Sequence, residues 1–385
     1  MLKTATLTWT SFYNYGTCLQ AYALQNYIES LGYENRIIDD SSIVFAGTKP
    51  EKSLVVESKW KRRWRKVWQS VYANYRTFYR CQRLLCRGVD EFKANTLKID
   101  RDTASVQKDE KDYDVYICGS DQIWTPSGFE NPRWTFYYAA FTNKNKISYA
   151  PSIGGYFIPD EWKDKVAELI SSFSAISVRE EAGRAALQEL TSQKVELVVD
   201  PTLLLSKQDW EEVLPRTIRK DGKYVLGYIL TPNDTYYQIA REYARQHGMK
   251  LFLFMLNLQD YGQADKYVSG SPLDFLEYVR NADVVFTDSF HGTIFSTIFE
   301  RPFYTFKRFA EDSPINQNSR IETLLKTMGA ENRLVNGKYP MALATDDLNF
   351  PEMKRWLEPL IADSKIFLKK NLSLIEKRSD GNYLS

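Results

Sequence analysis

Short apolar runs alternate with longer amphipathic stretches along most of the chain. A short apolar run is typical of a buried strand, and a stretch with an apolar residue at every third or fourth position is typical of a helix. The first such unit is a strand at 3–9, a helix at 18–31 and a strand at 34–38. Gly32 follows this helix directly, where a glycine commonly ends one. This β-α-β start predicts a parallel sheet that is covered by helices.

The same alternation continues through the rest of the chain. The further strands that it predicts lie at 113–118, 146–150, 175–178, 195–199, 224–230, 250–255, 283–287 and 303–306. The further helices lie at 232–247, 271–281 and 292–299, and a mostly helical tail runs from 351 to about 377. The predicted fold class is therefore α/β. We expect an N-terminal domain at 1–208, a C-terminal domain at 209–348 and a helical tail at 349–385.

The composition is that of an ordinary soluble globular protein, with 43% hydrophobic and 26% charged residues in a chain of 385. No run of about eighteen apolar residues occurs, which excludes a membrane-spanning helix. The first residues lack the layout of a signal peptide, so we expect a cytoplasmic protein. The four cysteines have no metal-binding spacing, and the two histidines exclude a histidine-rich zinc site, so no metal is expected.

The net charge of +2 conceals one strongly basic segment. Ten Lys or Arg and no acidic residue lie between Lys59 and Arg87, which leaves 41 basic against 49 acidic residues, a net charge of −8, in the rest of the chain. Aromatic residues recur in this segment at a helical period, so a helical insertion is predicted at about 58–98. One interpretation is a helix at a membrane surface, aromatic on one face and basic on the other. The other is a helix that packs on its own domain with solvated arginines. Nothing else in the chain supports nucleic-acid binding, so no nucleic acid is expected.

Polar and small residues gather in the loops that follow the predicted strands. These loops lie at 10–17, 119–124, 151–155, 179–180 and 288–292. Because ligands of parallel α/β sheets bind at the carboxyl ends of the strands, we expect these loops to surround a cleft between the two domains.

The loop at 288–292, with the sequence DSFHG, carries the sharpest chemical signal. It follows an apolar strand and opens a helix, whose first backbone N–H groups are unsatisfied and suit a phosphate. An imidazole gains or loses a proton near neutral pH, so His291 can act as an acid or hold an anion. The alternative is a helix cap, Asp288 or Ser289, beside a structural histidine. His247 is expected only to end its helix.

Two arginines can grip an anion at such a site. Arg179 follows an apolar strand, and Arg320 precedes a predicted helix. A guanidinium holds a carboxylate or a phosphate through two parallel hydrogen bonds. The alternatives are a surface ion pair of Arg179 with Glu180 or Glu181, and an exposed Arg320 at a helix start.

Two more strand-end loops carry groups that bind hydroxyls. At 14–16 an asparagine suits a sugar hydroxyl and a glycine suits a tight turn, with Gln20 one turn further on. At 119–122, Asp121 can accept a proton or a hydroxyl hydrogen, or it can cap the following segment. Neither loop is specific by itself.

Taken together the loops are specific, because several motifs occur in one order. They are NYG-x-x-LQAYAL, GSDQIW, SVRE, VDPTLLL, TDSFHG-x-x-FS and RIETLL. In this the chain resembles the polysaccharide pyruvyl transferase family, from about residue 11 to about residue 330.

The resemblance implies two Rossmann-like domains in a glycosyltransferase-B-like (GT-B-like) arrangement with a cleft between them. It also implies transfer of a pyruvyl group from phosphoenolpyruvate to two hydroxyls of a sugar, in a polysaccharide or a lipid-linked glycan, to form a cyclic ketal. No cofactor is implied beyond this donor substrate. A polyprenyl-linked acceptor would favour a weak hold of the basic segment 59–87 on the anionic inner face of the membrane.

Family members have a histidine with an arginine two positions before it in this loop. Here His291 matches the histidine, whereas Ser289 stands at the arginine position. We expect Arg320, Lys307 or Arg308 to take the place of that arginine. Arg179 matches an arginine of the N-terminal domain in the family.

The expected site therefore has three parts. His291 is the candidate acid, and Asp121 or Asp288 is the candidate base toward the sugar. The expected donor-binding residues are Arg179, Ser289, Phe290, His291, Gly292 and Arg320. The expected acceptor-binding residues are Asn14, Tyr15, Gly16, Gln20, Ser120, Asp121 and Gln122.

Two other hypotheses stay open. One is a glycosyltransferase of the same architecture that uses a nucleotide sugar. The other is a non-catalytic glycan-binding protein, which the serine at position 289 makes conceivable.

Overall fold

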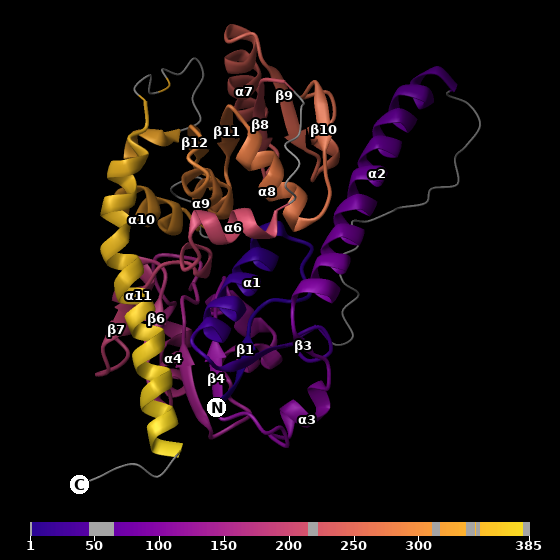
Figure 1. The fold of residues 1–385 in the computed structure, drawn as a ribbon. Helices are drawn as coiled ribbons and strands as arrows, with labels where there is room; N and C mark the ends of the chain where they lie inside the picture. Colours follow the sequence, from indigo (N-terminus) through magenta and orange to yellow (C-terminus); the bar gives the residue numbers. More distant parts are fainter. Residues whose placement is uncertain are drawn as a thin grey trace.

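The structure is a computed structural model, and it forms two α/β domains that stack on each other (Figure 1). In the helix that begins at Arg65, side chains are described from Asn74 onward. The residues that the structure describes are 2–45, 65–214, 222–309, 316–335, 343 and 347–379.

The N-terminal domain is built on a parallel sheet with the strand order β3-β2-β1-β4-β5. Strands β6 and β7 form a separate parallel pair, which an isolated bridge between Ile147 and Ala175 connects to the edge at β5. The strands are β1 (Lys3–Leu7), β2 (Glu34–Ile38), β3 (Ile99–Asp100), β4 (Val115–Cys118), β5 (Asn145–Ser148), β6 (Ile176–Val178) and β7 (Val195–Leu197).

The C-terminal domain repeats this plan with the parallel order β10-β9-β8-β11-β12-β13. Both orders match the Rossmann order 3-2-1-4-5, in which the order of the parallel strands reverses between the first and the fourth strand of the domain. The reversal lies between β1 and β4 in one domain and between β8 and β11 in the other. The strands are β8 (Tyr224–Tyr228), β9 (Lys250–Phe254), β10 (Lys266–Val268), β11 (Val284–Thr287), β12 (Phe303–Phe306) and β13 (Leu334–Val335).

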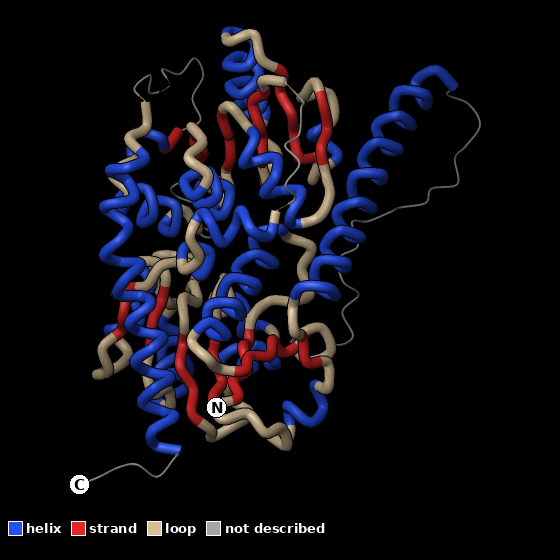
Figure 2. The backbone as a smooth tube through the Cα atoms, in the orientation of Figure 1, coloured by secondary structure: helices blue, strands red, loops and turns tan. Residues whose placement is uncertain are grey.

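Helices cover the sheets, as the alternating pattern predicted (Figure 2). Short 3-10 turns at η1 (Pro126–Glu130), η2 (Pro132–Tyr138), η3 (Pro201–Leu203), η4 (Leu258–Asp260) and η5 (Glu331–Arg333) carry no sequence period and were not predicted. The α-helices before the C-terminal tail are α1 (Tyr15–Ser30), α2 (Arg65–Thr96), α3 (Thr103–Gln107), α4 (Asp160–Ser171), α5 (Glu181–Gln188), α6 (Lys207–Val213), α7 (Asp234–Gln246), α8 (Pro272–Asn281), α9 (Phe290–Ile298) and α10 (Ser319–Thr327).

Two helices begin earlier than predicted, because their caps lie further upstream. Asn14 accepts a hydrogen bond from the backbone N–H of Thr17 and starts α1 at Tyr15 rather than at residue 18. Ser289 accepts one from the N–H of Gly292 and starts α9 two residues early. The NYG motif and the histidine of DSFHG therefore lie on first helical turns.

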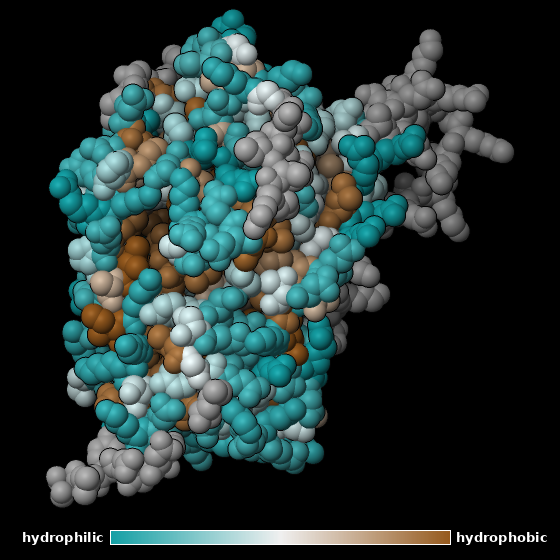
Figure 3. Space-filling model, in the orientation of Figure 1, coloured by the Kyte–Doolittle hydropathy of each residue, from teal (hydrophilic) through white to brown (hydrophobic). Residues whose placement is uncertain are grey.

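Aromatic side chains join the two domains. Tyr15 of α1 stacks on Phe275 of α8 with ring centroids 5.2 Å apart. Trp210 of α6 contacts Tyr22 of α1 at 5.7 Å and Phe295 of α9 at 5.0 Å. One apolar core therefore runs through both domains, and on the face in Figure 3 apolar residues gather across the middle, where the domains meet. Such an interface holds the loops of the two sheets in a defined relative position.

The predicted tail is one helix, α11 (Phe350–Ser379), that runs along both domains (Figure 1). At its start the ammonium group of Lys354 pairs with Glu300, at the C-terminal end of α9. Further on, the hydroxyl of Ser364 accepts a hydrogen bond of 2.9 Å from the backbone N–H of Val199. This helix therefore links the C-terminal domain to the loop that follows β7.

The basic insertion forms the long helix α2, whose first half extends away from the body in Figures 1 and 2. Its second half is anchored: the amide of Gln82 donates to the carbonyls of Met255 and Leu256 at 3.3 and 3.1 Å. Residues 58–64 of the predicted segment lie outside the described residues. Packing on its own domain was one interpretation, and the helix in fact contacts both domains. In the part of the chain that the structure describes, no helix is long and apolar enough to cross a membrane.

Candidate active site

The reversal points of the two sheets face each other across a small pocket. Loops after β1 and β4 form one side, and loops after β8 and β11 form the other. The pocket has a volume of about 80 Å³. Its lining residues are Trp9, Asn14, Thr17, Asp121, Gln122, Leu230, Asp288, Ser289, Phe290, His291, Arg308, Phe309, Gln317, Arg320 and Ile321.

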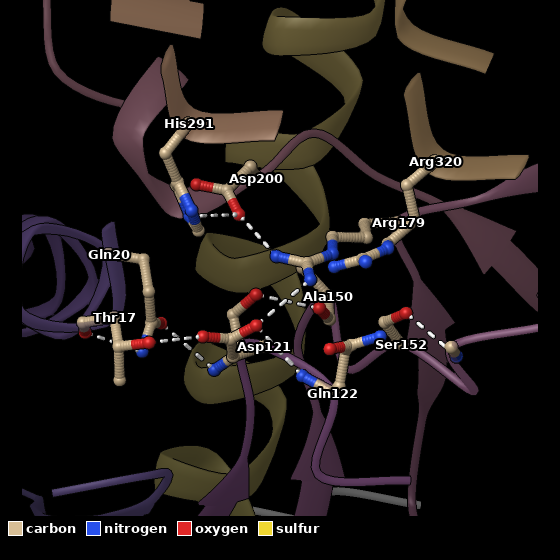
Figure 4. A network of polar contacts seen from close by, with 12 residues as sticks. Thr17, Gln20, Asp121, Gln122, Ala150, Ser152, Arg179, Asp200, His291 and Arg320 are labelled. Atoms are coloured by element: carbon tan, nitrogen blue, oxygen red, sulfur yellow. Dashed lines mark hydrogen bonds and ion pairs between the residues drawn. The ribbon is translucent and has the colours of Figure 1, made fainter. Parts of the chain in front are cut away.

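Beneath this pocket, Arg179 connects two buried carboxylates (Figure 4). Its Nη1 donates to Oδ2 of Asp200 at 2.8 Å, and its Nη2 donates to Oδ1 of Asp121 at 3.1 Å. Burial alone would raise the pKa of both carboxyl groups. Their pKa values instead lie below the ordinary range, because the positive charges of Arg179 and His291 and hydrogen bonds from threonines outweigh it. Both acids are thus held as carboxylates.

His291 projects from the first turn of α9 toward Asp200 and the N-terminal domain (Figure 4). Its Nε2 lies 3.6 Å from Oδ2 of Asp200 and has no hydrogen-bond partner within the described chain. On the other side, a β-carbon added to Gly16 would lie 2.1 Å from Nδ1 of the imidazole. Gly16 therefore has no side chain because the ring occupies that space. The imidazole is thus held between Gly16 and the carboxylate of Asp200, and His291 lines the pocket.

Arg320, in the first turn of α10, brings a second guanidinium to the pocket. It lies over the ring of Phe290 at 6.0 Å, and Arg179 lies over the same ring at 4.8 Å. Its Nη2 donates to the neutral amide oxygen of Gln317 at 3.3 Å. Burial and the charge of Arg179 lower the pKa of Arg320 to about 10. The charge of an anion in the pocket would offset both effects.

Asp288 is buried at the end of β11 and holds the loop after β8. Its carboxylate accepts hydrogen bonds from the backbone N–H groups of Leu230 and Thr231 at 2.6 and 2.9 Å. Burial raises its pKa to about 6, although these bonds and the charge of Arg308 oppose the shift. Since both oxygens serve the backbone, the position of Asp288 fits loop support better than the predicted role of base.

Ser289 and Gly292 shape the start of α9. Ser289 lines the pocket and caps the helix through Gly292, so a serine at the family's arginine position has a structural role here. A β-carbon on Gly292 would lie 2.5 Å from Oγ1 of Thr287, which explains the glycine by close packing. Phe290 and His291, the first residues of α9, also line the pocket, and the first backbone N–H groups of a helix suit an anion.

Several predicted contact residues lie behind the pocket wall. The hydroxyl of Ser120 donates to the carbonyl of Ala150, and the amide of Gln20 donates to Oγ1 of Thr8. Tyr15 is buried at the domain interface. The side chain of Arg179 is fully enclosed. We therefore reassign these four residues from direct ligand contact to support of the wall, because protein groups occupy their surroundings. Asn14, Asp121 and Gln122 do line the pocket.

Sequence reasoning missed three residues of the site. Asp200, which bridges Arg179 and His291, stands in the VDPTLLL motif directly after a predicted strand, a signal that could have identified it. Thr17 donates its hydroxyl to Oδ2 of Asp121 at 2.8 Å. Glu180 is buried and accepts the N–H of Ile153 at 2.9 Å, and burial raises its pKa against the charges of Arg179 and Arg320.

Two Rossmann-like domains whose reversal points face one another define an α/β protein of GT-B-like arrangement, with a buried histidine and arginines at the domain junction. The family model described as polysaccharide pyruvyl transferase matches residues 14–308, which is most of the chain. The protein belongs to this family. No curated protein matches the chain.

Solved structures that are similar to this chain include two UDP-GlcNAc 2-epimerases and a heptosyltransferase. The UDP-GlcNAc 2-epimerase from Methanocaldococcus jannaschii has a TM-score of 0.47 at 11% identity, with 94% of this chain and 93% of that chain covered. The UDP-GlcNAc 2-epimerase from Neisseria meningitidis, bound to UDP-GlcNAc, has a TM-score of 0.46 at 9% identity, with coverage of 96% and 99%. A heptosyltransferase from E. coli with ADP has a TM-score of 0.39 at 10% identity, with coverage of 95% and 100%.

Proposed function

We propose that this protein transfers a pyruvyl group from phosphoenolpyruvate to two hydroxyls of a sugar in a glycan, forming a cyclic ketal and releasing phosphate. One observation carries the proposal. In a member of the polysaccharide pyruvyl transferase family, the imidazole of His291, held beside the carboxylate of Asp200, lines a pocket between the domains together with Arg308 and Arg320.

The charge of the pocket suits the donor. Phosphoenolpyruvate carries a carboxylate and a phosphate, and both need cationic or N–H partners. Arg320 lines the pocket without a carboxylate on its Nη2, and Arg308 lines it from the C-terminal domain. The start of α9 adds backbone N–H groups. We assign the donor to this pocket.

His291 is the proposed acid. It gives a proton to the methylene carbon of phosphoenolpyruvate, which leaves an electrophilic centre at the adjacent carbon. A sugar hydroxyl attacks that carbon, the bond to the phosphate oxygen then breaks, and the second hydroxyl closes the ketal. The proton of one hydroxyl replaces the one given to the methyl group, and the proton of the other leaves with phosphate. A positioned acid or base of this kind contributes about 10²–10⁴-fold to a rate.

The same histidine is also the proposed base. Asp121 shares one oxygen with Arg179 and the other with Thr17, and its lowered pKa makes it a poor proton acceptor. Asp288 is engaged by two backbone N–H groups. After protonating the methylene carbon, His291 is free to take the proton of the attacking hydroxyl. The buried carboxylate of Asp200 orients the ring through both steps. This chemistry requires no redox cofactor.

A glycosyltransferase that uses a nucleotide sugar is the second candidate, because the GT-B-like arrangement also suits that reaction. The deciding assay incubates the protein with phosphoenolpyruvate and a panel of hexosides and lipid-linked sugars. Phosphate release and the mass of the product are measured. Pyruvylated product is expected. A thermal shift by nucleotide sugars, with none by phosphoenolpyruvate, would favour the glycosyltransferase. Tight sugar binding without turnover of either donor would favour a non-catalytic glycan-binding protein.

A further inference from the structure

A larger pocket opens beside the one that contains His291. Its volume is about 540 Å³, against about 80 Å³ for the first, and loops of both domains line it. A volume of this size is in the range of pockets that enclose a sizeable organic ligand. Its lining residues are Thr125, Pro126, Ser127, Ile153, Gly154, Gly155, Tyr156, Phe157, Pro159, Lys307, Asn316, Gln317 and Glu322.

The two pockets share a wall. Gln317 lines both, and its Oε1 accepts a hydrogen bond of 2.6 Å from Nε2 of Gln122, which lines the smaller one. One amide from each domain thus stands between the two pockets, and Nη2 of Arg320 donates to the same Oε1 of Gln317 at 3.3 Å. Because Gln317 lines both pockets, a ligand in the larger pocket would lie next to the one that His291 lines.

Aromatic rings stand at the rim of the larger pocket. Phe157 is 69% exposed and Tyr156 is 41% exposed, which is unusual for two adjacent large aromatic residues. The hydroxyl of Tyr156 donates to Oε2 of Glu322 at 2.8 Å, and Nζ of Lys307 lies 3.2 Å from Oε1 of the same carboxylate. The pocket therefore combines an exposed apolar ring with ordered charged and hydroxyl groups.

The loop that carries these rings is seated on the C-terminal domain. Gly154 has a φ of +74°, a left-handed conformation that favours glycine. The hydroxyl of Ser319 donates to the carbonyl of Gly155 at 3.3 Å. Relative domain position therefore sets where the aromatic rings stand above the pocket.

We propose that the larger pocket binds a pyranose ring of the acceptor glycan, with the ring of Phe157 stacked on its apolar face. A pyranose has carbon-bound hydrogens on its faces and hydroxyls at its edge. It therefore matches an exposed aromatic ring above carboxylate, ammonium and amide groups. The direction of the reacting hydroxyls toward His291 rests on the proposed function. The acceptor site thus lies in the loops at 125–127 and 153–159, not at the buried Tyr15, Gln20 and Ser120.

Ligand-observed saturation-transfer NMR tests the proposal without any donor present. The probes are methyl β-glucopyranoside, methyl β-galactopyranoside, N-acetylglucosamine and lactose. Phe157→Ala should weaken sugar binding about tenfold, because the apolar face of the sugar is then no longer buried against an aromatic ring. Phe157→Tyr should retain binding. Ile366→Ala, at a residue of α11 that is 59% exposed, is the matched control and should behave as the wild type. Absence of sugar signal in the wild type, or equal signals with and without Phe157, would overturn the proposal.

Kinetics separate this inference from the proposed function. With turnover, Phe157→Ala should raise KM for the acceptor about tenfold and leave KM for phosphoenolpyruvate unchanged. Sugar binding that depends on Phe157 without any phosphate release would keep the sugar pocket and refute the pyruvyl transfer. If phosphate is released but the acceptor KM does not change in Phe157→Ala, the pyruvyl transfer would stand and the sugar pocket would be refuted.

Discussion

The Nε2 atom of His291 lies 3.6 Å from Oδ2 of Asp200, and this pair connects the two domains. Asp200 follows β7 in the N-terminal half, and His291 lies in the first turn of α9 in the C-terminal half. The same carboxylate oxygen accepts a hydrogen bond from Arg179 at 2.8 Å. Imidazole, carboxylate and guanidinium thus form one chain across the junction, so the geometry around His291 depends on how the domains meet.

Replacement of His291 tests the proposed acid. His291→Asn should lower phosphate release from phosphoenolpyruvate by about 10²–10⁴-fold, since the variant lacks the imidazole that is proposed to protonate the methylene carbon. The circular dichroism spectrum should stay that of the wild type. The other histidine provides the control: His247 is exposed and stacks on Tyr243, so His247→Asn should keep full activity. A His291→Asn enzyme with wild-type turnover would remove this histidine from the chemistry.

Asp200 should act as a positioning residue. Asp200→Asn leaves the enclosed Arg179 with one carboxylate less, and we expect the free energy of unfolding to fall by about 3 kcal/mol. The turnover per folded molecule should also fall, and its pH profile should change, because the imidazole loses its neighbouring charge. Asp260→Asn is the control: Asp260 is equally buried, accepts from backbone N–H groups after β9, and lines neither pocket. It should lose stability only. An unchanged pH profile in Asp200→Asn would contradict the assignment.

Arg320 should serve the donor rather than the fold. Arg320→Gln removes a cation that lies near Arg179, so stability should stay equal or rise. The dissociation constant of phosphoenolpyruvate should increase about 10–100-fold, the usual effect of losing charge-assisted hydrogen bonds. Isothermal titration calorimetry measures this dissociation constant for Arg320→Gln and for the control variant Arg355→Gln, which lies on the exposed face of α11. Wild-type affinity in Arg320→Gln would exclude Arg320 from the donor site.

Asp288 predicts a pH dependence of stability. Burial raises its pKa to about 6, above the value of about 3.9 in an unfolded chain. The folded state therefore binds more protons between these values, and the stabilisation is complete below pH ~4 and lost as the pH rises through ~6. Two pKa units correspond to about 3 kcal/mol. Denaturant unfolding at several pH values should show this slope in the wild type.

In Asp288→Asn, the decrease in the free energy of unfolding as the pH rises from ~4 to ~6 should be smaller by about 3 kcal/mol. Asp283→Asn, at the start of β11, removes a carboxyl that accepts a hydrogen bond from the N–H of Tyr224 and should retain the wild-type slope. Identical slopes in Asp288→Asn and the wild type would show that Asp288 does not titrate in this range.

We propose that α2 holds the protein weakly on an anionic membrane, which would suit a cytoplasmic enzyme with a lipid-linked acceptor. Arg80, Arg83 and Arg87 are exposed on its described part, as is Leu84. The protein should sediment with anionic vesicles at low salt and dissociate at high salt. Each basic residue near such a surface contributes about 1 kcal/mol.

The double variant Arg80→Gln/Arg83→Gln should therefore bind about 30-fold more weakly. Lys369→Gln/Lys370→Gln removes the same charge from exposed positions of α11 and should have little effect. Equal binding to neutral and anionic vesicles would argue against membrane attachment by α2.

Local patterns predicted most of the longer strands and several helices, and the neighbourhood of the site, but not the short elements β3, β10 and β13 or the helices α3 to α6. The apolar run before DSFHG correctly predicted β11, and the period after it predicted α9, because strand and helix repeats are encoded within about a dozen residues. Since parallel strands share a carboxyl edge, the loops after β1, β4, β8 and β11 could be expected to converge, and residues from all four line one pocket.

Side-chain partners depended on how distant segments pack. Arg179 meets Asp200 and Asp121 across 21 and 58 positions of the chain, and no local period encodes those contacts. The same packing encloses Tyr15 and Gln20, although their motif suggested contact with a sugar. Periodicity reports which face of an element is apolar. Which polar group faces a ligand and which is buried beneath it follows from domain docking, because burial depends on the surfaces that both domains bring together.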